Sequence, residues 1–254
     1  MQEKALTIGR YLLTKLAGAG FSIFIYFLVI LMSAEFDMYD TVENFNQTKM
    51  LWFIFYAYGI TCSIVIDGLT TRVKKFHQTT KIVLYIVAGF AYFLVRGVNP
   101  FTLFAGAVGA IFSLLFYLET IFSKKNVWRR WLFAVVIPLF LITLLSIDFT
   151  TKKQWNEMRT DNSFQATFSY FHGKHEIPVY LEQGDTLTFT IEFHPTNGGG
   201  YGYHVRNKEN QYVGITELGE NTRSITAKAT DTYYIVVTGH HLSGSITVEW
   251  EVGK

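Results

Sequence analysis

The chain has 254 residues, of which half are hydrophobic, 17% are aromatic and only 17% are charged, with a formal net charge of +2. Its low proline and high aromatic content exclude a disordered or collagen-like chain. The single cysteine, Cys62, excludes an intramolecular disulfide framework and a cysteine-based metal centre, and the small net charge gives no indication of a nucleic-acid partner.

Apolar stretches in the first 148 residues predict a bundle of five transmembrane helices. A helix rises about 1.5 Å per residue, so about 20 apolar residues cross a hydrocarbon core of about 30 Å. The third stretch is short, but Arg96 can extend it by reaching the interface. Asn99-Pro100 predicts a tight turn, which makes 82–118 a helical hairpin. The predicted spans cover about 11–34, 50–67, 81–97, 100–120 and 131–148.

Lysine and arginine are distributed unequally between the two sides of this bundle. Eleven of them fall on the N-terminal side and only two, Lys49 and Arg96, on the other, where the 35–49 loop is acidic. Because basic loops stay in the cytoplasm, we expect a cytoplasmic N-terminus, an uncleaved signal anchor and, after an odd number of spans, an external C-terminus. The eleven are Lys4, Arg10, Lys15, Arg72, Lys74, Lys75, Lys81, Lys124, Lys125, Arg129 and Arg130.

The pattern changes after Asp148. Residues 149–254 contain nine Lys/Arg and twelve Asp/Glu, and their hydrophobic residues alternate with polar ones. Seven or eight such runs, separated by Gly, Asn, Asp and Pro, predict an extracytoplasmic antiparallel β-sandwich over 164–254. Residues 149–163 are expected to be a short stalk.

Part of this second half resembles a known family. Phe171 and Gly173, the run from Val179 to Leu187 with Gly184-Asp185, and the late segment from Tyr233 to Val237 are similar to bacterial pre-peptidase C-terminal domains and related jelly-roll modules. The resemblance covers about 85 residues and none of the membrane half. It implies a jelly-roll fold and a non-catalytic binding or spacing role, sometimes with calcium, and it assigns no ligand residue here.

Histidines in the second half are candidate metal ligands. His172, His175, His240 and His241 would suit a divalent ion such as Zn²⁺ or Cu²⁺, because neutral imidazole is the commonest metal ligand. No carboxylate or thiol accompanies them at a recognised metal-site spacing. The alternative is that they are surface histidines at loop tips, in which case the protein needs no cofactor.

Two further sets of residues are candidates for contacts. Tyr201, Tyr203 and Tyr212 could form an aromatic face for a partner, although their alternation fits burial equally well. Small side chains at a spacing of four predict close helix packing, between the first and fourth spans of one or two copies. These are Gly18, Ser22, Ala105, Gly106, Gly109, Ala110 and Ser113.

Ionisable residues fall at the ends of the spans. Asp67 is the deepest of them and is expected to pair with a cytoplasmic base, and Glu119, Arg96 and Asp148 are the others. The sequence contains no His-Glu-x-x-His, Gly-x-Ser-x-Gly or phosphate-loop motif. We therefore expect a protein that is not an enzyme.

These observations predict a multi-pass plasma-membrane protein that presents an external β-sandwich. Its partners would be the lipid bilayer and an envelope component, a peptide, a membrane protein or a second copy, in an accessory, sensor or immunity role. The absence of disulfides favours a bacterial envelope, although Asn46-Gln47-Thr48 is a glycosylation sequon. The alternatives are a small transporter or channel subunit with an external adaptor domain, and a histidine-dependent, metal-binding envelope enzyme.

Overall fold

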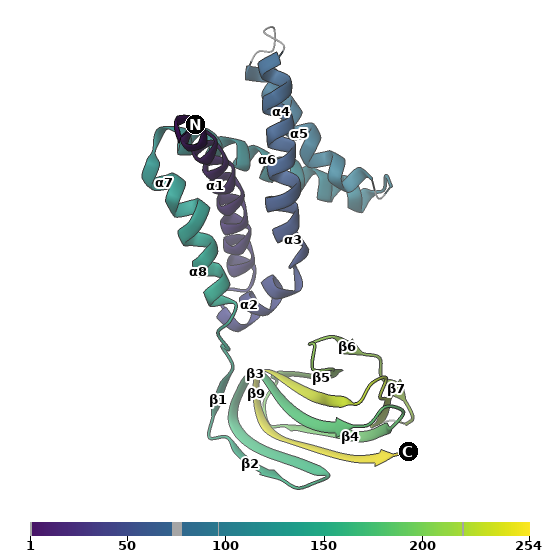
Figure 1. Ribbon diagram of the computed structural model, residues 1–254. Coiled ribbons are helices and arrows are strands. Elements are labelled where there is room, and N and C mark those ends of the chain that lie inside the picture. Colours follow the sequence, from purple (N-terminus) through teal and green to yellow (C-terminus); the bar gives the residue numbers. More distant parts are fainter. Residues whose placement is uncertain (1, 73–77, 96, 220) are drawn as a thin grey trace. The chain divides into compact units, whose positions relative to one another are not determined.

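A computed structural model describes residues 2–72, 78–95, 97–219 and 221–254. The chain divides into a helical unit, residues 1–148, and a β unit, residues 149–254 (Figure 1). Lys74, Lys75 and Arg96 lie outside the described residues, as do the side chains of Lys4 and Arg72.

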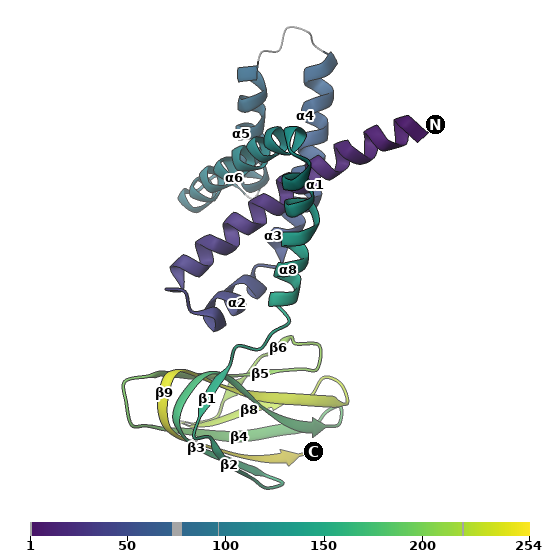
Figure 2. The same ribbon diagram turned by 90° about the vertical axis from the view of Figure 1, so that its left-hand side faces the viewer.

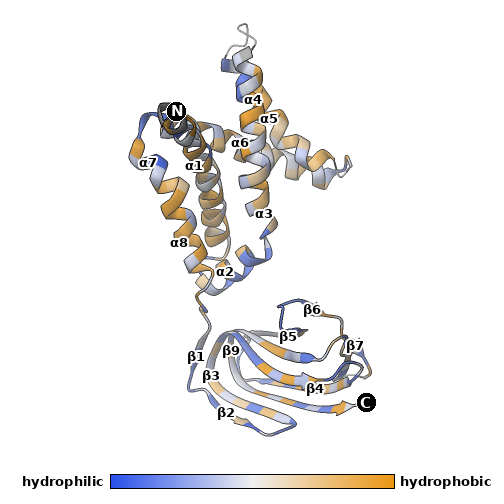
Figure 3. Ribbon diagram, viewed as in Figure 1, coloured by the Kyte–Doolittle hydropathy of each residue, from blue (hydrophilic) through white to orange (hydrophobic). Residues whose placement is uncertain are grey.

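Four segments of the helical unit are long and apolar enough to cross a membrane, namely Leu6–Ser33, Met50–Thr71, Pro100–Lys125 and Val127–Leu144. A fifth apolar helix, α5, has 17 residues and so a length of about 26 Å. Figure 3 shows the contrast between the hydrophobic α8 and the hydrophilic α2. The helices are α1 (Gln2–Ser33), α2 (Met38–Gln47), α3 (Met50–Phe53), η1 (Ile54–Gly59), α4 (Ile60–Arg72), α5 (Gln78–Leu94), α6 (Pro100–Lys125), α7 (Val127–Trp131), η2 (Leu132–Val136) and α8 (Ile137–Leu144).

Three helical features were not anticipated from the sequence. The acidic 35–49 loop contains α2, which is capped at its N-terminus by Asp37, whose carboxylate accepts a hydrogen bond from the backbone N–H of Asp40. α2 buries Val42 and Phe45, so its apolar side chains contribute to the core. η1 and η2 are π-helical turns inside otherwise α-helical segments, a local widening that is often found at functional sites.

The hairpin predicted around Asn99-Pro100 is present as α5 and α6. The Asn99 side chain accepts from the backbone N–H of Thr102, and the Thr102 hydroxyl accepts from the backbone N–H of Asn99. Pro100 occupies the first turn, where a missing N–H costs nothing. The two helices then pack closely, because a Cβ on Gly89 would come within 2.5 Å of the Gly109 carbonyl oxygen.

α1 lies at the centre of the helical unit. It packs along α6 and along the segment formed by α7, η2 and α8 (Figure 2). Ile23 of α1, Phe116 of α6 and Leu141 of α8 are buried in the same hydrophobic cluster. This arrangement leaves the outer faces of the helices apolar and exposed, as expected where lipid surrounds them.

The β unit is a continuous antiparallel sheet that encloses a core. Figure 1 shows β3 and β9 running side by side as long curved strands. The hydrogen-bonded order is β1-β3-β9-β4-β8-β7, with β2 on β3, β5 on β9, and β6 on β5. The strands are β1 (Thr151–Lys153), β2 (Asn156–Arg159), β3 (Ser163–Leu181), β4 (Thr186–Pro195), β5 (Gly200–Arg206), β6 (Tyr212–Val213), β7 (Thr216–Glu217), β8 (Thr222–Thr226) and β9 (Asp231–Gly253).

β3 and β9 each contribute to two layers. The first half of β9 pairs with the second half of β3 and with β5, whereas its second half pairs with the start of β3 and with β4. Phe189 of β4, Ile235 of β9 and Ile177 of β3 are buried in the one core that results. The glycine-flanked segment 239–244 lies inside β9, where the register with β3 shifts.

The stalk predicted over 149–163 differs from what is observed. β1 and β2 in that segment pair antiparallel with β3 and belong to the β unit. Most of their side chains are exposed and polar, and Trp155 between them packs on the core. Because edge strands of this kind have no inward-facing apolar row, hydrophobic alternation does not reveal them.

Candidate functional site

A β-bulge between β3 and β9 brings three histidines together. Phe171 pairs with Leu242 and Gly173 pairs with Gly239, so the single residue His172 stands opposite both His240 and His241. Nitrogen atoms of the three rings lie within 4.8 Å of one another. The ring centroids of His172 and His241 are 4.5 Å apart, and those of His172 and His240 are 5.0 Å apart.

The bulge is held by its neighbours. His241 has a φ of 51°, in the left-handed region that a non-glycine residue rarely adopts. Asn197 fixes it from the β4–β5 loop, because its Nδ2 donates to the His241 carbonyl and its Oδ1 accepts from the Ser243 N–H. Gly199 allows this close approach, since a Cβ there would lie 2.5 Å from the same carbonyl oxygen.

The chemistry available to this histidine cluster is metal ligation. His172 is buried, whereas His240 and His241 are exposed and can adjust their rings. Three imidazoles plus a water form a common open zinc site, with Zn–N distances of about 2.0–2.1 Å. The Tyr170 hydroxyl lies 2.7 Å from the His241 Nδ1, where it can orient that ring and leave Nε2 for an ion.

His175, the fourth predicted ligand, is elsewhere. Its ring stacks on Phe164 with the centroids 4.7 Å apart, and its Nδ1 lies 2.7 Å from the Nζ of Lys152. Three residues beyond His172 on β3, it is held among aromatic side chains rather than with the other histidines. Burial, together with the positive charge of Lys152, lowers the pKa of His175 to about 4.

This pKa predicts a loss of stability in mild acid. In the unfolded chain the histidine pKa is about 6.5, so between pH 6.5 and 4 the unfolded state binds a proton that the folded state does not. We expect the free energy of unfolding to fall by at most about 1.4 kcal/mol per pH unit over that window and to be unaffected by His175 above it. Thermal unfolding of the full chain at pH 7.5 and pH 5 measures this. The His175→Gln variant should show a smaller difference, and an equal difference would contradict the prediction.

The three candidate tyrosines have different environments. Tyr201 and Tyr212 are exposed, with Tyr201 stacked on Phe193 and Tyr212 against His204. Tyr203 packs against the core and its hydroxyl accepts from Arg223 Nε at 2.8 Å. Only Tyr201 and Tyr212 are therefore available to a partner.

A polar network lies inside the helical unit, where Lys15 of α1 is buried. The Lys15 Nζ donates to the Ser63 hydroxyl at 2.7 Å and to Asp67 Oδ2 at 2.6 Å. Lys81 of α5 pairs with the other Asp67 oxygen, and Tyr11 donates to Asp67 Oδ2. The pairing expected for Asp67 is thus with two lysines. From the sequence, Lys15 counts only among the basic residues on the N-terminal side of the bundle. Its position in the sequence does not distinguish a buried lysine from one at the membrane interface.

A second buried carboxylate, Glu119 of α6, also has partners. Its two oxygens bind the Arg129 guanidinium and the Ser123 hydroxyl. Arg130 donates to the Ser123 carbonyl from Nε at 3.0 Å and from Nη2 at 2.9 Å. These contacts join the end of α6 to α7 and satisfy carbonyls that a helix C-terminus leaves unpaired.

The small residues predicted for helix packing lie against more than one helix. Gly18 faces Phe116 and Thr120 of α6, whereas Gly106 and Gly109 face Phe90 and Phe93 of α5. In the same region the Ser22 hydroxyl donates to the Gly18 carbonyl and the Ser113 hydroxyl to the Tyr85 carbonyl. Ala110 is buried and Ala105 half-buried.

Gly20, which was not predicted, has the closest approach, since a Cβ there would lie 1.8 Å from the Phe133 carbonyl oxygen.

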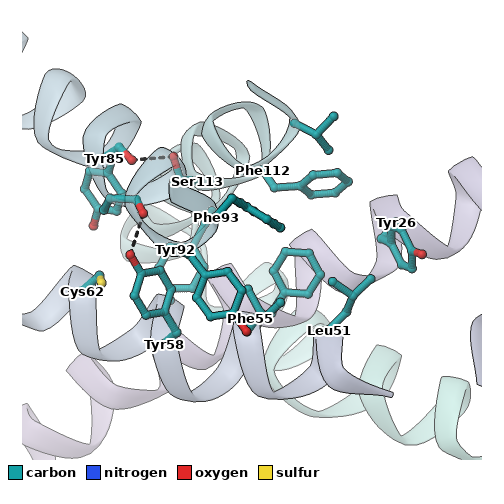
Figure 4. Close-up of a pocket in the computed structure, with 17 residues that line it drawn as sticks. Tyr26, Leu51, Phe55, Tyr58, Cys62, Tyr85, Tyr92, Phe93, Phe112 and Ser113 are labelled. Carbon is teal, nitrogen blue, oxygen red and sulfur yellow. Dashed lines mark hydrogen bonds between the residues drawn. The ribbon is translucent and has the colours of Figure 1, made fainter. Parts of the chain in front are cut away.

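An aromatic cavity of about 110 Å³ lies between α4, α5 and α6 beside the π-helical turn η1 (Figure 4). Phe55 and Tyr58 of η1, Tyr92 of α5 and Phe112 of α6 line it. The Tyr58 hydroxyl donates to the Ala88 carbonyl at 2.6 Å, so that polar group is satisfied. Ser113 and Cys62 also line the cavity, but most of its wall is apolar, which suits hydrocarbon rather than an ion.

The chain has little detectable similarity to known proteins. No protein-family model matches the chain, and no curated protein matches it. A solved structure of PliG, a periplasmic lysozyme inhibitor of g-type lysozyme from Aeromonas hydrophila, aligns with 35% of this chain and 87% of that chain. The identity is 17% and the TM-score is 0.26.

Proposed function

We propose that the chain is a multi-pass plasma-membrane protein of non-enzymatic function that crosses the bilayer five times and presents its β unit outside the cytoplasm. There the β unit binds an envelope component, a peptide or a membrane-protein partner. The observation that carries the proposal is the separation of apolar helices from a β unit that has its own complete core. The distribution of lysine and arginine supports the orientation.

α5 is the span that decides the orientation, because four spans would leave both ends of the chain on one side. It is short, but a bilayer can thin around a short helix at modest cost. Its close hairpin with α6 and its exposed Val83 and Val87 fit a helix within lipid. We therefore count it as a span.

The β unit has exposed aromatic side chains suited to binding. Tyr180, Tyr201 and Tyr212 are each more than half exposed, and tyrosine is enriched at the centres of protein interfaces. The resemblance of the β-unit sequence to pre-peptidase C-terminal modules also supports a binding role.

Cysteine labelling of intact cells tests the orientation. Cys62 is first replaced by Ala, and single cysteines are then placed at exposed Lys208 in the β unit and exposed Lys125 at the end of α6. A membrane-impermeant maleimide should label Lys208→Cys and leave Lys125→Cys unlabelled until the cells are opened. The reverse pattern, or labelling of both, would overturn the proposed topology.

We propose as a second function that the β unit binds a divalent transition metal through His172, His240 and His241. The bulge that sets three imidazoles against one another supports this, and a sensor role would follow from it. Chelator-treated full-length protein in detergent is expected to take up one Zn²⁺ per chain. The variant that tests the site carries His240→Ala and His241→Asn. Asparagine is chosen at position 241 because it tolerates the positive φ of that residue.

The metal content of that double variant should fall to background, whereas His194→Ala, which changes an exposed histidine on β4, should bind as the unmodified chain does. Elemental analysis after gel filtration measures both. Equal zinc in the double variant and the unmodified chain would dispose of the metal site and leave the binding-module proposal standing.

A further inference from the structure

We propose that a groove between α1 and the junction of α6 with α7 binds an anionic phospholipid of the bilayer. The groove is open and has a volume of about 1000 Å³. Arg10, Lys124 and Arg130 line it together with Leu6, Leu13 and Trp131. This inference rests on the proposed membrane placement of the helical unit. It assigns an anionic lipid to the end of the helices where these three basic residues lie.

The charge of the groove is uniformly positive. Among its described lining residues there are three cations and no carboxylate. The nearby Glu119 is buried and occupied by Arg129 and Ser123, so it does not neutralise them. A phosphodiester would supply the missing negative charge, since guanidinium groups match phosphate oxygens in geometry as well as charge.

Arg130 gives the groove a fixed element. Its side chain is buried and held by the Ser123 carbonyl, to which both Nε and Nη2 donate. With Nε and Nη2 already donating to that carbonyl, Arg130 contributes an oriented positive charge, and the exposed guanidinium of Arg10 is the one that can donate to phosphate oxygens. Arg10 and Lys124 are exposed and can close on the same headgroup from α1 and from the end of α6.

The apolar part of the lining selects a lipid rather than a free anion. Leu6, Val127 and Trp131 are each more than half exposed and stand beside the basic residues. Tryptophan and exposed aliphatic side chains at the end of a span lie at the level of lipid headgroups and upper acyl chains. A molecule that offers phosphate and hydrocarbon together complements both halves of the groove.

Native mass spectrometry of the full-length protein tests the proposal. The protein is exchanged into detergent with equal amounts of phosphatidylglycerol and phosphatidylcholine, and bound lipid is counted. We expect the unmodified chain to retain phosphatidylglycerol preferentially. Arg10→Gln with Lys124→Gln should lower that preference by about fivefold for each charge removed.

The matched control is Lys208→Gln with Lys228→Gln, which removes two exposed charges from the β unit. It should keep the preference of the unmodified chain. Equal retention of both lipids by the unmodified chain, or an unchanged preference after loss of Arg10 and Lys124, would overturn the lipid site. Cysteine labelling is independent of this result, so failure of the lipid site is distinguishable from failure of the topology.

Discussion

Replacing Asp67 by Asn is expected to destabilise the helical unit by about 3–5 kcal/mol, because it leaves a buried charge without its partner. Lys15 is 1% exposed, and its ammonium has the Ser63 hydroxyl and the Asp67 carboxylate as hydrogen-bond acceptors. An asparagine can still accept a hydrogen bond but supplies no negative charge. The thermal unfolding midpoint of the full chain in detergent should fall accordingly.

The matched control is Glu35→Gln, which removes an exposed carboxylate between α1 and α2 and should change stability by no more than about 0.5 kcal/mol. A double variant, Lys15→Met with Asp67→Asn, removes the buried pair as a whole and should recover much of the loss. If Asp67→Asn unfolded at the same temperature as the unmodified chain, the network would not contribute to holding α1, α4 and α5 together.

Gly244→Ala should be the most damaging single-methyl change in the β unit, with an expected loss of more than about 3 kcal/mol. Gly244 has a φ of +136°, which an alanine does not readily adopt. The added Cβ would lie 2.1 Å from the His194 carbonyl oxygen, so a backbone atom of β4 would have to move. Tryptophan fluorescence during urea unfolding of the full chain measures the effect.

Gly214→Ala is the comparison for this change, because no heavy atom lies within 4 Å of the position its Cβ would take. It should alter stability by at most about 0.5 kcal/mol. Equal behaviour of the two alanine variants would show that the bend at Gly244 relaxes freely, and that β9 is not fixed there.

Sequence patterns predicted the broad architecture because each half of the chain carries its own pattern of hydrophobic residues. Apolar stretches near the length of a bilayer and alternating strands are local signals. The hairpin at Asn99 was predictable for the same reason, since the cap residues and the proline are adjacent in sequence.

The histidine cluster could be predicted only in part. Its members were candidates by residue type, but a bulge that sets His172 against His240 and His241 depends on the register of two strands about 70 residues apart. The same register separates His175 from them. Lys15 shows the corresponding problem in the helical unit, because only the packing of α4 against α1 reveals that it is buried.

The long strands also set the order in which the β unit can form. β3 and β9 pair between residues as far apart as Ser163 and Glu249, and β9 is the central strand with which β3, β4 and β5 all pair. Contacts so distant in sequence make folding slow, because a large loop must close before they form. Until the residues of β9 have left the ribosome, β3, β4 and β5 lack the strand with which they pair. The β unit can therefore complete its core only after the whole of β9 is available.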